Sequence, residues 1–61
     1  MKLQFLTIEI DGKCFDLPKD MQIPEKGDTV FIEGKVGIVD RKNYHIVDGK
    51  VHMISIFATK A

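Results

Sequence analysis

Residues 6–17 read LTIEIDGKCFDL, and this stretch decides the fold. Apolar and polar side chains alternate on both sides of Asp11-Gly12, a dipeptide preferred in the type I′ turn of a β-hairpin. A two-residue turn there pairs Leu6 with Leu17, Ile8 with Phe15, Ile10 with Lys13, Glu9 with Cys14 and Thr7 with Asp16. Apolar side chains then gather on one face, and a slip of one residue would destroy that sorting. The stretch therefore predicts an antiparallel hairpin with one buried face.

Two further reversals follow the same logic. With Asp48-Gly49 as a turn, the predicted pairs are Ile46 with Val51, Tyr44 with Met53, Val47 with Lys50 and His45 with His52. Residues 33–35 predict a three-residue hairpin loop with Gly34 in the left-handed conformation. That loop pairs Ile32 with Val36, Val30 with Ile38, and Phe31 with Gly37, where the aromatic ring covers the glycine.

These reversals predict an all-β domain that occupies residues 1–61. Strands are expected over residues 2–10, 13–17, 29–33, 36–47 and 50–59, with a long loop over residues 18–28. A bulge near Phe5-Leu6 explains why Leu3 and Phe5 are out of phase with the rest of the first strand. Residues 36–47 form one long bent strand, or two strands split by a turn at residues 40–43. Five strands joined in sequence predict an antiparallel meander that curls into an SH3-like, partly open barrel, closed by the first and last strands.

Composition limits the function classes. Nine basic and nine acidic residues cancel, whereas a nucleic-acid or anionic-membrane partner usually requires a basic surplus. No apolar stretch approaches the length of a membrane span, and the N-terminus lacks a secretory signal. The single cysteine, Cys14, points to the cytoplasm. No catalytic triad, phosphate loop or dinucleotide motif is present, so we expect neither an enzyme nor a bound cofactor.

Residues 27–41 read GDTVFIEGKVGIVDR and resemble the KOW motif of small SH3-like barrels in ribosomal proteins and transcription elongation factors. The shared features are a Gly-Asp opening, an alternating strand, a glycine turn and a Gly-Ile-Val strand. The overall layout is also similar to small uncharacterised barrels of bacteria and their phages. This resemblance implies the barrel fold and binding to RNA, the ribosome or RNA polymerase.

Apolar residues lie on both faces of the last strand, which leaves two interpretations open. A second bulge near Met53-Ile54 would restore the phase of the strand. Otherwise Ile54 and Ile56, with Phe31 and Val39, form an exposed apolar patch that binds a protein partner or a second copy of the chain. In the long loop, Met21 and Ile23 either cover an open barrel end as a lid or contact a partner directly.

Two polar clusters complete the candidate sites. His45 and His52 lie opposite each other in the predicted register, where they either share a metal ion, titrate together or have no role. With Cys14 they provide three ligands, fewer than a structural zinc needs. Arg41, Lys42 and Tyr44 form a basic-aromatic cluster that could hold a nucleic-acid backbone and stack on a base, although the predicted register turns Tyr44 toward the core.

Three functions follow as hypotheses. The first is a small protein-interaction module, an adaptor or inhibitor of phage or mobile-element type, that can self-associate as a homodimer. The second is a KOW-like module that binds RNA, the ribosome or RNA polymerase. The third is a small-molecule or metal binder that uses His45 and His52.

Overall fold

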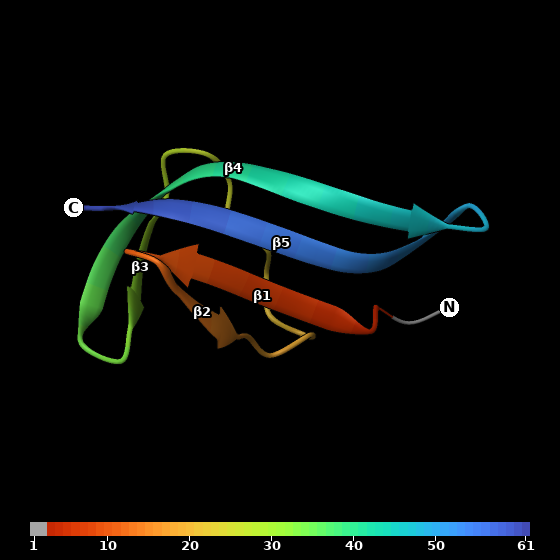
Figure 1. Ribbon diagram of the computed structural model, residues 1–61, viewed down its shortest axis with the longest axis horizontal. Coiled ribbons are helices and arrows are strands. Elements are labelled where there is room, and N and C mark those ends of the chain that lie inside the picture. Colours follow the sequence, from red (N-terminus) through yellow and green to blue (C-terminus); the bar gives the residue numbers. More distant parts are fainter. Residues whose placement is uncertain (1–2) are drawn as a thin grey trace.

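The computed structural model describes residues 3–61 and contains five strands (Figure 1). They are β1 (Phe5–Ile10), β2 (Lys13–Asp16), β3 (Thr29–Ile32), β4 (Lys35–Val47) and β5 (Lys50–Lys60). The strands form a single curled sheet, an open half-barrel, as the all-β prediction requires. Among the described residues, no helix has the length and apolar character needed to cross a bilayer.

The strand order is β2-β1-β5-β4-β3, and β1 runs parallel to β5. The prediction of a purely antiparallel meander is therefore wrong. The first and last strands do pair, but they meet at the centre of the sheet, so β2 and β3 become its edges. The reason is the long connection from β2 to β3, which separates the β1–β2 hairpin from the β3–β4–β5 unit. The two units then join through β1 and β5, and the barrel stays open between β2 and β3.

The register of the first hairpin is confirmed. Ile8 pairs with Phe15 and Glu9 with Cys14, and the amide of Leu17 donates a hydrogen bond of 2.8 Å to the carbonyl of Leu6. The turn residues have φ angles of 52° at Asp11 and 77° at Gly12. Two successive positive φ values define the type I′ turn, whose twist matches that of the strands it joins.

The hairpin between β3 and β4 differs from the prediction by one residue. Ile32 pairs with Lys35, Phe31 with Val36 and Val30 with Gly37, so the turn contains two residues rather than three. Glu33 and Gly34 have φ angles of 47° and 82°, which again match a type I′ turn. Gly37 consequently faces the core, where a Cβ atom would lie 3.1 Å from the Cβ of Ala58.

Bulges correct the phase of both long strands. The pairing of β4 with β5 shifts between Val39 and Arg41, which leaves Asp40 as an extra residue in one continuous, bent strand. A second shift leaves His52 as an extra residue in β5, one position before the bulge predicted near Met53-Ile54. Beyond it Tyr44 pairs with Ile54, so the predicted pairing of Tyr44 with Met53 is wrong. No bulge lies between Phe5 and Leu6, because β1 pairs with β5 in unbroken register from Phe5 to Ile10; Leu3, which precedes the strand, packs against the core out of phase with it.

The core lies on the concave face of the sheet and is aliphatic. Its buried members are Leu6, Ile8, Ile10, Val39, Ile54, Ile56 and Ala58. Met21 and Ile23 of the long loop are partly buried against this cluster, as the lid interpretation predicts. Alternating residues of β1 and β5 supply most of the core because these two central strands are the best covered part of the sheet.

An ion pair ties the long loop to β4. The Nζ atom of Lys42 lies 3.2 Å from the Oε1 atom of Glu25 and 5.7 Å from the ring centroid of Tyr44. A hydrogen bond with Tyr44 and the interaction with Glu25 raise the pKa of Lys42 above its ordinary value. The turn before β3 is fixed as well, because Asp28 Oδ2 accepts a 2.7 Å hydrogen bond from the amide of Glu25.

The same substitution at two isoleucines tests where the core lies. Ile8 is 0% exposed and Ile46 is 63% exposed. We expect Ile8→Val to lower the free energy of unfolding by about 0.5–1.5 kcal/mol, because it removes a buried methylene group. Ile46→Val should change it by less than about 0.5 kcal/mol. Urea denaturation measures both, and equal losses would contradict the assignment of the core face.

A second matched pair tests the two-residue turn at Glu33-Gly34. Glu33 adopts a φ of 47°, where an L-residue other than asparagine, aspartate or glycine pays roughly 1–2 kcal/mol. We expect Glu33→Asn to raise the free energy of unfolding by about 0.5–1 kcal/mol. Asp48 has a similar φ of 52° and already tolerates it, so Asp48→Asn should change stability by less than about 0.5 kcal/mol. A destabilising Glu33→Asn substitution would argue for the three-residue loop.

Candidate functional site

The outer edge of β3 offers unpaired backbone groups. Ile32 and Lys35 close the two-residue turn, and the next pair of the same kind is Val30 with Gly37. In an antiparallel ladder, hydrogen-bonded pairs alternate with pairs that are not bonded to each other. Thr29 and Phe31 therefore direct their amide and carbonyl groups away from β4. Since β3 has β4 as its sheet neighbour on one side and is an edge on the other, these groups face the opening of the half-barrel.

An apolar groove of about 410 Å³ runs beside this edge. Its lining residues come from β3 and from the segment that follows β2: Leu17, Pro18, Met21, Val30, Phe31 and Ile32. Phe31 is 77% exposed, which is the highest value among the large apolar side chains of the described part of the chain. We call this set of six residues the edge groove. It combines free backbone groups with apolar side chains, and this combination can bind an extended peptide as an added strand.

The structure separates the predicted partner-binding residues into two groups. Phe31 and Met21 line the edge groove. Val39, Ile54 and Ile56 are 1–4% exposed and belong to the core, so the predicted exposed patch over the last strand does not form. The bulge at His52 is the reason, because it turns the alternate residues of β5 inward. Ile23 packs against the core beneath the loop.

The predicted basic-aromatic cluster is divided between the two faces of the sheet. Lys42 pairs with the buried Ile56 and lies on the concave side with Tyr44. Arg41 lies on the convex side, where its guanidinium carbon is 4.7 Å from the ring centroid of Phe57. A shared nucleic-acid surface would require these side chains on one face. Arg41, Lys42 and Tyr44 therefore do not make one site.

The predicted pairing of His45 with His52 is wrong. His45 pairs with Met53, and its Nε2 atom lies 3.4 Å from the Oγ atom of Ser55. His52 is the bulge residue, and its ring packs edge-on against Phe5 with a centroid distance of 5.6 Å. Within residues 3–61 no three His, Cys, Asp or Glu side chains are grouped to hold a metal ion.

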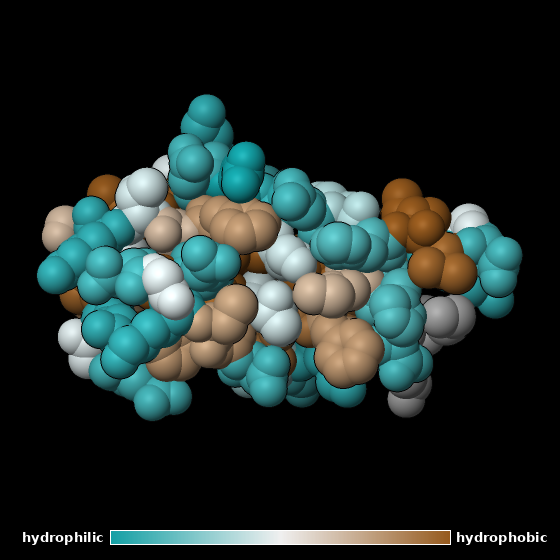
Figure 2. Space-filling view, viewed as in Figure 1, coloured by the Kyte–Doolittle hydropathy of each residue, from teal (hydrophilic) through white to brown (hydrophobic). Residues whose placement is uncertain are grey.

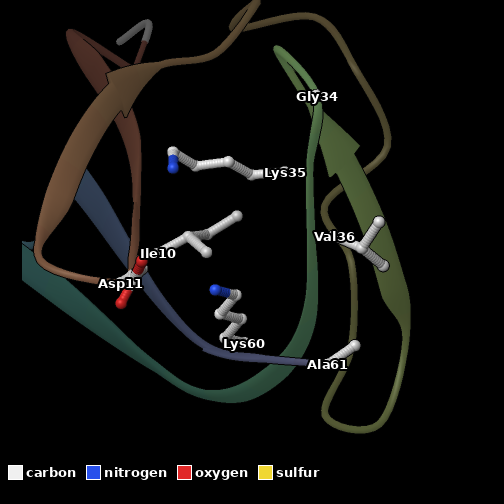
Figure 3. A pocket seen from close by; sticks show the side chains of 7 residues that line it. All are labelled: Ile10, Asp11, Gly34, Lys35, Val36, Lys60 and Ala61. Carbon is white, nitrogen blue, oxygen red and sulfur yellow. The ribbon is translucent and has the colours of Figure 1, made fainter.

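A cavity of about 290 Å³ opens at the end of the half-barrel where the β1–β2 and β3–β4 hairpin turns meet the end of β5. Figure 3 shows Lys35 and Lys60 extending into this space on either side of Ile10. Asp11 lies at its rim. We call this cavity, with Lys35 and Lys60 as its cationic groups, the basic mouth.

The convex face of the sheet is mixed in character. Figure 2 shows apolar side chains over β1 and β5 interleaved with hydrophilic ones, and a more strongly apolar spot near the β4–β5 turn. Phe5 and Val47 are each 52% exposed. Polar residues such as Thr7 and Ser55 pair across this face, so its apolar groups are interrupted rather than gathered into a groove.

Sequence reasoning missed most of the edge groove and both lysines of the basic mouth. It placed Leu17, Val30 and Ile32 in apolar cross-strand pairs and did not propose Pro18 as a contact residue. One signal in the sequence could have predicted that the lysines lie together, namely the position of each lysine in the strand register. Lys13 pairs with the buried Ile10, Lys35 pairs with the half-buried Ile32, and Lys60 follows Ala58 by two residues, so all three share the concave face near strand ends.

Comparison with protein-family models, with curated proteins and with solved structures finds no match for this chain. The geometry of the edge groove and the basic mouth is therefore the basis for a functional interpretation.

Proposed function

We propose that the protein is a non-enzymatic interaction module that binds an extended segment of a partner protein along the outer edge of β3. The observation that carries the proposal is the coincidence of two features at one place. The backbone of Thr29 and Phe31 is unpaired toward the opening of the sheet, and the edge groove lies directly beside it. An added strand would satisfy the backbone groups and narrow the gap between β3 and β2.

The chemistry of the groove defines the class of partner. Its six lining residues are all apolar, and a strand points alternate side chains to one side. A segment with apolar side chains at every second position would place them against Met21, Val30 and Ile32. Phe31 lies on the opposite side of β3 and can pack on the intervening side chains. The site gathers apolar surface and backbone groups rather than an acid, a base or a nucleophile, so the proposal contains no catalytic step.

A second candidate function rests on the resemblance of the chain to SH3-like barrels that carry a KOW motif. Residues 27–41 form the β3–β4 hairpin and the bulge that follows it, and their likeness to the KOW motif supports a role at RNA, the ribosome or RNA polymerase. The neutral charge of the chain favours the protein partner over the nucleic acid.

Selection from a random twelve-residue peptide library displayed on phage tests the edge groove. We expect the selected peptides to carry apolar residues at alternate positions and to contact β3. Phe31→Lys should weaken the binding of a selected synthetic peptide about tenfold or more, because a lysine on an edge strand opposes strand addition. Isothermal titration calorimetry measures the affinity.

Phe5→Lys is the matched control, since Phe5 is also an exposed phenylalanine but lies in β1 at the centre of the sheet. It should leave peptide affinity unchanged. Equal losses in the two variants, or amide shift changes that avoid residues 29–33, would contradict the proposed site. Sedimentation of the free protein identifies one special case. A dimer that Phe31→Lys converts into a monomer would mean that the extended segment is β3 of a second copy.

A further inference from the structure

The basic mouth and the edge groove are neighbours. Ile32 lines the groove, Lys35 lines the mouth, and the two residues face each other as the closing pair of the β3–β4 hairpin. Directly paired residues of antiparallel strands lie about 4.5–5.5 Å apart. A segment that follows β3 toward its turn therefore ends beside Lys35.

The cations of the basic mouth are free to meet a partner. Lys35 is half-buried and Lys60 is exposed, and neither forms an ion pair with another described residue. Lys13 shares their face of the sheet on β2, the opposite edge of the opening. The carboxylates in the neighbourhood are Asp11 at the rim and Glu33 in the turn. Lys35 and Lys60 are thus the two cationic side chains that line the cavity, and Asp11 is the one acidic side chain that lines it.

We propose that the extended segment bound at the edge groove carries an acidic residue at the end that lies next to the Glu33-Gly34 turn, where Lys35 and Lys60 receive its carboxylate. This inference rests on the proposed function. It adds that the partner segment carries a negative charge and specifies at which end of the edge groove that charge lies. Apolar side chains of the segment cover Met21, Val30 and Ile32, and the next side chain on the same face reaches the mouth. Ile10 lies between the two lysines (Figure 3) and lines the same cavity, so the carboxylate would lie beside an apolar side chain.

Charge complementarity distinguishes this occupant from a second copy of the chain. Suppose that β3 pairs antiparallel with β3 of a second copy, with Phe31 opposite Phe31. Thr29 then lies opposite Glu33, and Asp28 lies opposite Gly34, across the new interface. Glu33 belongs to the turn that follows β3, and in this pairing it lies opposite Thr29 of the other copy rather than opposite Lys35 or Lys60. A self-paired edge therefore leaves Lys35 and Lys60 without a carboxylate, whereas a separate segment with an acidic end supplies one.

The test compares two synthetic peptides. One is a peptide selected on the wild-type protein that contains an acidic residue at one end, and the other differs only by the corresponding amide, Gln for Glu or Asn for Asp. We expect the acidic peptide to bind wild type about three- to tenfold more tightly, the range that one or two exposed ion pairs supply. The double variant Lys35→Gln/Lys60→Gln should bind both peptides equally, and added salt should weaken the acidic peptide more than the amide peptide.

The control is Lys26→Gln/Lys50→Gln, which removes the same charge at two exposed lysines elsewhere and should preserve the preference for the acidic peptide. Equal binding of the two peptides to wild type, or loss of the preference in the control variant, overturns this inference and leaves the edge groove intact as a site. If selection yields no peptide whose binding depends on Phe31, the proposed function fails as well. The two failures are therefore distinguishable.

Discussion

The parallel pairing of β1 with β5 is the interaction on which the rest of the structure depends. It joins a two-stranded hairpin to a three-stranded unit, and it places Ile8 beside Ile56 and Leu6 beside Ile54 at the centre of the core. A two-stranded hairpin is at best marginally stable alone. Because both central strands contribute alternate residues to the same concave face, neither unit can bury its apolar side without the other.

This pairing also determines where the sheet is incomplete. With β1 and β5 at the centre, the short strands β2 and β3 become edges and face each other across the opening of the half-barrel. The segment after β2 covers part of the opening with Leu17 and Met21, which pack against the core. The remaining exposed edge of β3 lies beside their side chains. The edge groove is thus a consequence of the topology, since in a closed barrel the same backbone groups would be hydrogen-bonded to a neighbouring strand.

The bulges decide which side chains are available to a partner. Without the extra residue His52, the alternation of β5 would place Ile54 and Ile56 on the convex face. With it, these residues enter the core, and the exposed apolar surface shifts to Phe31 and to scattered residues such as Phe5. The same bulge separates His45 from His52 and removes the symmetrical pair that a regular ladder would produce. A single inserted residue thereby changes both the apolar surface and the polar candidates.

Local sequence determined the strands and their turns, while tertiary structure decided the sheet order and the surface. The two Asp-Gly turns predicted every residue pair of the first hairpin. In the last hairpin they predicted the pairs from the turn up to Ile46 with Val51, because turn geometry and alternation act over a few residues. The parallel contact of β1 with β5 joins residues 48 positions apart in the sequence. It depends on which units can cover each other, and local alternation contains no such information. The bulges and the meeting of Lys35 with Lys60 arise in the same way, since each requires two strands to be in register before it exists.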